Sequence, residues 1–401
     1  MLRSNAPQPS SHGVRIVAGV AGPLAIIICL FPEPLLPLAA DRVWLSVDHS
    51  TDPRINHEPK PLELTKLVTQ FAKEHNIVDF FPPNTSIMHT EFARQRSQPG
   101  QIVIGADSHT CSGGGMGAFA VGLGAGDAVL PLVTGRTWFR VPETVRIELE
   151  GRPAFGISGK DVMLHILGKL KRNTVALGRA VEYGGPGMRY LSCDARFALA
   201  NMATEFGALA GVCVADAVTA AALAKRERVG RAFDAAAKGC GCSASAPQPL
   251  GDDAARMDGE TKAKAEAAMA IAGAVGDIER DGAASVTARA PSSSAAAHVS
   301  EALYFKADPG CEYSSVHKID LGEVAPVIAR YPSPDDCVPV NDPAVKGLPL
   351  DGCFIGACTT AQEELVLAGL VLDAALKAGR VPTAATAAGK APQRRVTPGS
   401  V

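Results

Sequence analysis

Short apolar runs of strand length alternate along this chain with longer segments of helical periodicity, and this order constrains the fold more than any other feature. Strand-like runs occur at 77–81, 102–106, 144–150 and 353–357. Apolar residues recur at helical spacing over 62–75, 195–210 and 361–379. Ser158 and Asp161 stand three residues apart, which predicts a capping box at the start of a further helix. Strands that alternate with helices predict an α/β fold with a largely parallel sheet.

Charge and cysteine content exclude several classes of protein. The chain has 401 residues, enough for two to four domains at about 100 to 200 residues each. With 39 Lys and Arg against 41 Asp and Glu, the net charge is −2, so a broad nucleic-acid-binding surface is not expected. Ten cysteines without dense, regular spacing favour free thiols in an intracellular compartment over a disulfide framework. Cys240 and Cys242 are separated by one residue, which is tighter than metal-ligand spacing usually is.

Both ends of the chain and one internal segment differ from the rest in composition. Residues 1–40 are apolar and proline-rich and stay unassigned. Their pattern leaves open a secretory signal, a mitochondrial presequence, a plain buried strand or a misassigned start, while prolines cut short any membrane span. We predict no membrane association. The Ala- and Ser-rich stretch 229–300 is predicted to be a linker or an insertion between ordered parts at 41–228 and 301–401.

Polar residues that could carry chemistry follow two of the predicted strands. Asp48 and His49 come directly after the apolar run RVWLSV, and Asp107, Ser108 and His109 follow the run at 102–106. The second group precedes a glycine-rich stretch whose backbone amides could approach an anionic ligand. Because parallel sheets bind ligands at the carboxyl ends of their strands, both groups are site candidates, with surface polar residues and an ordinary turn as the alternatives.

Four further residues are candidates on weaker signals. His89 alone has the pattern of a loop histidine with a local partner. Asn201 and Glu205 lie four residues apart on one predicted helical face, which fits either a site or a structural hydrogen-bond network. Cys358 lies between a predicted strand and a helix, where the helix dipole favours a thiolate, although an isolated cysteine is more often a small buried hydrophobe.

Several longer motifs occur in one order along the chain. They are DSHT before the glycine-rich stretch, GRTWFRVPETVRIELEGRP, GISGKDV, VEYGGPGMRYL, ANMATEFGALAG and FIGACTT. Together they resemble the large iron–sulfur part of the aconitase family, and within it homoaconitase and the 3-isopropylmalate dehydratase large subunit. The resemblance covers about 47–225 and 303–400. It implies α/β/α three-layer domains with mostly parallel sheets, one at 41–228 and a partial one at 301–401.

The resemblance also implies a function, a cofactor and a first set of roles. Family members are hydro-lyases that remove and add water on a tricarboxylic or 2-alkylmalate-type hydroxy acid through a [4Fe–4S] cluster, as in steps of lysine or leucine biosynthesis. Cys358 matches the first cluster ligand, and Asn201 matches an asparagine beside the cluster. His49, oriented by Asp48, matches the histidine that protonates the leaving hydroxyl group.

Two further His–carboxylate pairs match family residues that fix tautomers and handle the water. They are His89 with Asp107 and His109 with Glu205, while Ser108 between them would contact the substrate. If these roles are correct, the catalytic residues and Cys358 should converge on one cleft, although 309 positions separate Cys358 from His49 (358 − 49).

The sequence departs from the family pattern after Cys358. The family's second and third cluster cysteines lie in a later Pro-Gly-Cys-x-x-Cys segment, and only one of the three expected ligands is matched, so we predict a chain truncated before that segment. The swivel domain, which can be a separate subunit, is an expected partner beside the small hydroxy acid. The location is predicted to be mitochondrial or cytoplasmic. A cluster-free remnant with a binding or regulatory role, and an enzyme that uses Cys358 alone, are the alternatives.

Overall fold

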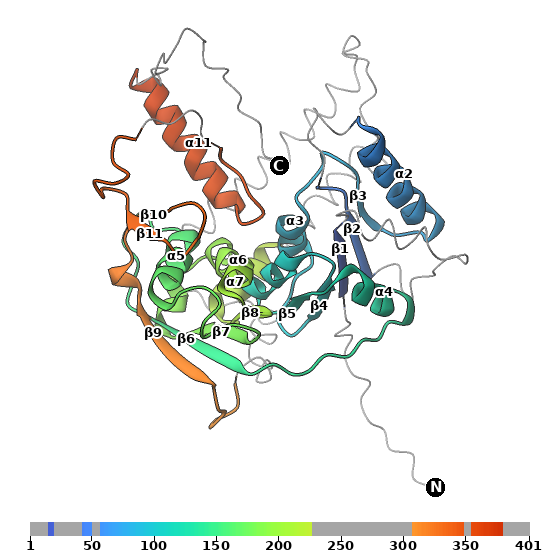
Figure 1. The fold of residues 1–401 in the computed structure, drawn as a ribbon, viewed down its shortest axis with the longest axis horizontal. Coiled ribbons are helices and arrows are strands. Elements are labelled where there is room, and N and C mark those ends of the chain that lie inside the picture. The colour runs from blue at the N-terminus through green and yellow to red at the C-terminus, as the bar shows by residue number, and fades with distance from the viewer. Residues whose placement is uncertain (1–14, 20–41, 50–56, 227–306, 349–353, 380–401) are drawn as a thin grey trace. The chain divides into compact units, whose positions relative to one another are not determined.

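The computed structural model describes residues 15–19, 42–49, 57–226, 307–348 and 354–379 (Figure 1). Contacts divide the chain into one unit of Met1–Ala215 with Tyr304–Val401 and a second unit of Asp216–Leu303. In the second unit residues 217–226 are helical, and the side chain of Asp216 accepts hydrogen bonds from the backbone of Val218 and Thr219. The predicted boundaries at 40/41, 228/229 and 300/301 lie outside the described residues, so these divisions stay predictions.

The first sheet has five parallel strands in the order β3-β2-β1-β4-β5. Their bounds are β1 Arg15–Gly19, β2 Val43–Ser46, β3 Asp79–Phe81, β4 Ile102–Gly105 and β5 Phe119–Gly122. The connecting helices are α2 Pro59–Glu74, α3 Met88–Gln95, the 3₁₀ helix η2 Ser108–Met116 and α4 Ala125–Thr134. The central strand β1 comes from the N-terminal segment that the sequence left unassigned, and the rest of residues 1–40 lies outside the described residues.

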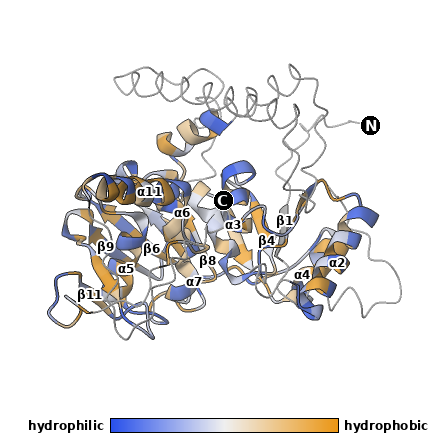
Figure 2. Ribbon diagram, turned by 90° about the horizontal axis from the view of Figure 1, so that it is seen from above, coloured by the Kyte–Doolittle hydropathy of each residue, from blue (hydrophilic) through white to orange (hydrophobic). Residues whose placement is uncertain are grey.

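Both faces of the first sheet are covered, as expected for parallel strands. Alternate residues of β2 point to opposite faces, so Val43 and Leu45 pack with Phe71 of α2, while Trp44 packs with Met88 and Phe92 of α3. In Figure 2 strand β4 is coloured hydrophobic, while helices α2 and α4 carry both hydrophobic and hydrophilic colours.

The second sheet has four parallel strands in the order β8-β7-β6-β9. Their bounds are β6 Thr144–Glu150, β7 Ala180–Gly184, β8 Ala210–Cys213 and β9 Ser315–Asp320. One face packs against α5 Gly159–Leu170, α6 Cys193–Asn201 and α7 Ala203–Phe206. The remaining elements are η3 Pro186–Tyr190, η5 Leu321–Glu323, the antiparallel pair β10 Val327–Ala329 and β11 Cys337–Pro339, and α11 Gln362–Lys377.

The structure confirms the α/β class, the mostly parallel sheets and the capping box at Ser158. Two expected elements differ. The single helix predicted over 195–210 is divided at Met202 and ends at Phe206, because Gly207 has a left-handed backbone with a φ of 90° and caps it; strand β8 begins at Ala210. The strand predicted at 353–357 is wrong for residues 354–357, where Phe354 is exposed and Gly356 has a φ of 142°. No described helix has the length and apolar character of a membrane span.

Candidate functional site

The carboxyl ends of β2 and β4, which flank β1, carry the first two groups of candidate residues. The Nδ1 atom of His49 lies 2.9 Å from Oδ1 of Asp48. The other carboxylate oxygen of Asp48 accepts a hydrogen bond from the backbone N–H of Met88 at 2.7 Å. Asp48 therefore joins the end of β2 to the start of α3 and orients the imidazole of His49.

Asp107 is the centre of the site. Its Oδ1 accepts hydrogen bonds from Nε2 of His89 at 2.8 Å and from the backbone N–H of His109 at 2.7 Å. Its Oδ2 lies 3.7 Å from Nε2 of His49. Three histidines thus meet one carboxylate. His89 is buried in the first turn of α3, so the interpretation as a loop histidine is wrong.

His109 connects this centre to the second half of the fold. Its Nε2 donates to Oε1 of Glu205 on α7 at 3.0 Å, and Oγ of Ser108 lies 3.2 Å from its Nδ1. The second carboxylate oxygen of Glu205 is buried and has no hydrogen-bond partner among the described residues. The two predicted His–carboxylate pairs are therefore present as contacts, and their roles remain predictions.

Glycine residues of η2 allow η2 to pack closely against α6 and β8. A Cβ at Gly114 would lie 1.7 Å from the carbonyl oxygen of Gly211 on β8, and one at Gly115 would lie 2.6 Å from Cα of Phe197 on α6. Both glycines are buried in η2. The glycine-rich stretch therefore serves close packing between η2, α6 and β8, and the expectation of open amides that approach an anion is wrong for these two residues.

Hydrogen bonds and burial shift the pKa values of the histidines and carboxylates of this site. Hydrogen bonds to Asp107 and then to Glu205 raise the pKa of His109 to about 10, although burial opposes this. Burial acts to raise the pKa of Asp107, but hydrogen bonds from His109 and His89 outweigh it and keep this pKa well below its usual range. The hydrogen bond to Asp48 raises the pKa of His49. At neutral pH the site thus contains ionised Asp107 beside protonated His109.

Cys358 reaches this region through Asn201. The fully buried Asn201 donates from Nδ2 to the carbonyl oxygen of Cys358 at 3.3 Å, and its Oδ1 lies 4.0 Å from the Cys358 sulfur. The electrostatic effect of Cys358 is one of the lesser causes that raise the pKa of His109. The predicted residues therefore gather in one region. Cys358 follows irregular backbone rather than a strand, which corrects the predicted strand end.

Cys111 and Thr204 also belong to the site, and the sequence reasoning missed both. The Cys111 thiol lies 3.3 Å from the carbonyl oxygen of Asn201 and 3.3 Å from Oγ1 of Thr204. Thr204 in turn donates to the carbonyl oxygen of Ser108 at 2.7 Å. These contacts fix η2 against the break between α6 and α7. The sequence signal is proximity to predicted site residues, since Thr204 precedes Glu205 and Cys111 lies two positions after His109.

The donor atoms of the described residues do not fit a four-iron cluster held by three thiolates. No group of three or more His, Cys, Asp or Glu side chains in the described ranges is placed to hold a metal ion. Among the described residues, Cys358 is the thiol that the motif FIGACTT places at the site. Burial raises the pKa of the Cys111 thiol to about 12, which keeps it protonated.

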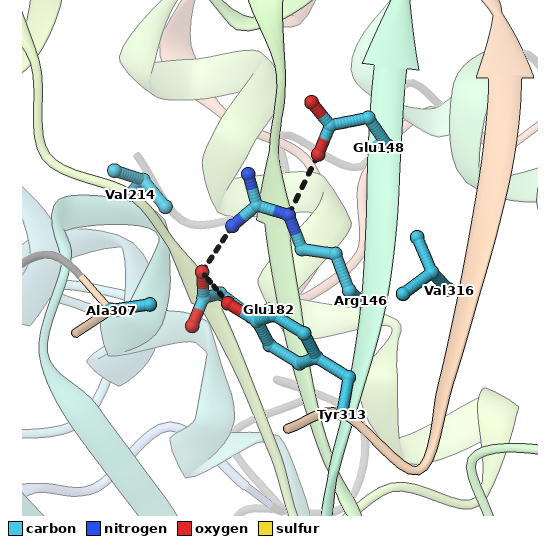
Figure 3. A pocket seen from close by; sticks show the side chains of 7 residues that line it. All are labelled: Arg146, Glu148, Glu182, Val214, Ala307, Tyr313 and Val316. Atoms are coloured by element: carbon cyan, nitrogen blue, oxygen red, sulfur yellow. Dashed lines mark hydrogen bonds and ion pairs between the residues drawn. The ribbon is translucent and has the colours of Figure 1, made fainter. Parts of the chain in front are cut away.

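A cavity of about 440 Å³ lies elsewhere, on the face of the second sheet opposite its core. Figure 3 shows Arg146 of β6 between the carboxylates of Glu148 and Glu182, with the ring of Tyr313 beside it. Tyr313 donates to Glu182 at 3.0 Å. The charged groups here pair with one another, and none of the predicted site residues lines this cavity.

The profile of the aconitase family (aconitate hydratase) matches residues 39–261. The chain belongs to the aconitase family. This confirms the resemblance, and the parallel α/β architecture agrees with it.

Named relatives agree with this assignment. The chain is 40% identical over 361 residues to aconitase htyD of Aspergillus rugulosus, a match that covers 90% of this chain and 32% of the relative. It is 38% identical over 362 residues to the 3-isopropylmalate dehydratase large subunit gloJ of Glarea lozoyensis, with coverage of 90% and 32%. Identity to 3-isopropylmalate dehydratase large subunit 1 of Methanopyrus kandleri is 27% over 373 residues, with coverage of 90% and 68%. The chain thus spans about a third of the length of the first two relatives.

Proposed function

We propose that this chain carries the proton-handling residues of a hydro-lyase that removes and adds water on a tricarboxylic or 2-alkylmalate-type hydroxy acid. The observation that carries the proposal is the meeting of His49, His89 and His109 at the single carboxylate of Asp107. Loss of water from such an acid requires a proton donor at the leaving hydroxyl, because hydroxide is a poor leaving group.

His49 is the proposed proton donor. Its side chain is 46% exposed, whereas that of His89 is 4% exposed, so a substrate can reach the ring of His49 and not that of His89. The hydrogen bond to Asp48 raises the pKa of His49, which favours the protonated ring near neutral pH. In the hydration direction the same ring takes the proton back from water.

The remaining residues position this donor and the substrate. His89 is buried and donates to Asp107, so it fixes the carboxylate that lies 3.7 Å from His49. Protonated His109, held by Asp107 and Glu205, offers positive charge beside an exposed Ser108, which suits a substrate carboxylate. The roles of Ser108 and Asn201 as substrate contacts belong to this proposal.

The proposal assigns no step to an iron–sulfur cluster, because the described residues supply one of the three thiolates. Cys358 is the residue we propose as a ligand. Relatives are named large subunits of 3-isopropylmalate dehydratase, and we propose that a separate swivel-domain subunit completes the site. A mitochondrial or cytoplasmic location remains a prediction.

The charge network favours the hydro-lyase over a binding or regulatory remnant. Burial of Asp107 acts against its ionised form, and hydrogen bonds from two histidines compensate. Such an arrangement has a direct use in proton transfer. An enzyme that uses Cys358 alone would need a base in hydrogen-bond contact with the thiol, whereas the Cys358 sulfur contacts the amide oxygen of Asn201 at 4.0 Å, and an amide oxygen is not a base.

The test uses a chimera in which this chain replaces the 361 matched residues of the Aspergillus rugulosus relative. After anaerobic reconstitution with iron and sulfide, hydration of homoaconitate, isopropylmaleate and cis-aconitate is followed by loss of absorbance of the conjugated double bond. His49→Gln should reduce kcat by about 100-fold or more. His317→Gln on β9, whose ring contacts Ser315, is the matched control and should retain activity. An inactive chimera beside an active unmodified relative, or an unchanged rate in His49→Gln, would refute the proposal.

A further inference from the structure

The peptide group between Ser108 and His109 is held at both of its ends. Its N–H, which belongs to His109, donates to Oδ1 of Asp107 at 2.7 Å. Its carbonyl oxygen, which belongs to Ser108, accepts a hydrogen bond from Oγ1 of Thr204 at 2.7 Å. Because a peptide group is planar, partners at both ends fix its orientation. This orientation sets the directions in which the side chains of Ser108 and His109 leave the backbone.

Thr204 is the partner that comes from a distant part of the chain. It lies on α7, 96 positions from Ser108, whereas Asp107 is the N-cap residue of η2 itself. The next residue of α7, Glu205, accepts a hydrogen bond from the ring of His109 at 3.0 Å. Two consecutive residues of α7 therefore hold two consecutive residues of η2, the first through the backbone and the second through the ring.

The hydroxyl group of Thr204 has a single proton, and its contacts define where that proton lies. The carbonyl oxygen of Ser108 can only accept, so Thr204 is the donor in that hydrogen bond. The thiol of Cys111, 3.3 Å from the same Oγ1, can therefore act only as the donor in its own contact with Thr204. Burial raises the pKa of this thiol to about 12, so the thiol keeps its proton. A methyl group in place of the hydroxyl could neither donate to Ser108 nor accept from Cys111.

The two residues that Thr204 holds are those that the proposed function places against the substrate. Ser108 is exposed, and the side chain of His109 is 23% exposed. Under the proposed function, both residues contact a substrate carboxylate. Because the proton of Thr204 is committed to the Ser108 carbonyl oxygen, Thr204 acts through Ser108 and His109 and not on the substrate itself.

We propose that Thr204 is a positioning residue for substrate binding. Its hydroxyl group holds the Ser108–His109 peptide group in the orientation that presents the Ser108 hydroxyl and the His109 ring to one carboxylate of the substrate. This inference rests on the proposed function, from which it takes the hydroxy acid. It assigns Thr204 an effect on the KM, whereas the proton donor His49 affects kcat.

The substitutions separate the hydroxyl group of Thr204 from its methyl group. Thr204→Val keeps the branched shape and removes the hydroxyl, while Thr204→Ser keeps the hydroxyl and removes the methyl group. The matched control is Thr69→Val on α2. Thr69 is also partly buried, and it also donates to a backbone carbonyl oxygen, that of Thr65, at 2.7 Å.

The first measurement uses the 401-residue chain alone and needs no activity. Amide hydrogen exchange of His109, followed by NMR, reports whether its N–H stays paired with Asp107. Thr204→Val should speed this exchange at least about tenfold, whereas Thr204→Ser and Thr69→Val should change it less than about twofold. Unchanged exchange in Thr204→Val, or equally fast exchange in Thr204→Ser, would overturn the proposal, because the hydroxyl group would then not hold this peptide group.

The second measurement is the steady-state kinetics of the reconstituted chimera. Thr204→Val should raise the KM about fivefold and change kcat less than about twofold, and Thr204→Ser should restore the KM. A purely structural role would lower the amount of active enzyme, so a fall in kcat with an unchanged KM would overturn the proposal. An inactive wild-type chimera beside an active unmodified relative refutes the proposed function itself, and the positioning role falls with it.

Discussion

Replacing Glu205 by glutamine removes one charge from the site while keeping the shape of the side chain, and its effect on His109 can be calculated. The pKa of His109 is about 10 against an ordinary value of 6.5. At about 1.4 kcal/mol per pKa unit, this difference corresponds to about 5 kcal/mol between the two protonation states, and to about half of that after solvent screening of a ring that is 23% exposed. Asp107 is the larger cause and Glu205 the second.

Glu205→Gln should therefore lower the pKa of His109 by about 1 and leave it above its ordinary value, since Asp107 remains. Because the folded-state pKa is raised, the stabilisation is fully present below about pH 6.5 and disappears as the pH rises through about 10. The variant should be less stable than wild type by about 1 kcal/mol at pH 6, and the difference should shrink by pH 9.5.

The assay is a histidine-detected NMR titration of the isotopically labelled chain, with urea unfolding at both pH values. Glu150→Gln is the matched control, because Glu150 pairs with Lys318 on the second sheet, away from the site. This control should leave the titration of His109 unchanged. A wild-type His109 that titrates near 6.5, or an unchanged pKa in Glu205→Gln, would refute the reasoning.

Three further predictions test packing, the proton donor and the metal. Gly114→Ala should lower the free energy of unfolding by at least about 2 kcal/mol. The control Gly126→Ala should not lower it, because a Cβ at Gly126 meets nothing within 4 Å. Equal urea midpoints for the two variants would contradict the packing argument. Asp48→Asn should lower the pKa of His49 towards 6.5, and an NMR titration that shows no change would remove Asp48 as its cause. After anaerobic reconstitution with iron and sulfide, the 401-residue chain should bind well under one four-iron cluster per chain. Cys358→Ala should abolish the remaining iron binding. Stoichiometric four-iron incorporation into the chain, measured by iron and sulfide analysis with EPR, would contradict this prediction.

Local sequence pattern predicted the parts of the fold that depend on local physics. The alternating run 144–150 is β6 with the same bounds, because one of its faces is buried and the other carries Arg146 and Glu148. The run at 353–357 failed because apolar composition alone does not distinguish a buried strand from an apolar segment such as the one that holds exposed Phe354.

The candidate site shows a similar limit. Position after a strand identified Asp48, His49 and Asp107, because carboxyl ends of parallel strands meet at one edge. The contact of His109 with Glu205 joins residues 96 positions apart and depends on close backbone packing at Gly114. No local pattern reports such a contact, so the resemblance to a family supplied it. The contacts of Cys111 became visible only in the structure.

Asp107 tests the central claim most directly, since the account makes its carboxylate the point where all three histidines meet. The measurement is kcat for hydration of the unsaturated acid by the reconstituted chimera, compared between wild type and Asp107→Asn. The expected result is a fall in kcat of about 100-fold or more, with the cluster content, measured by iron analysis, unchanged. A variant that keeps wild-type kcat would contradict the claim that this carboxylate organises the proton-handling site.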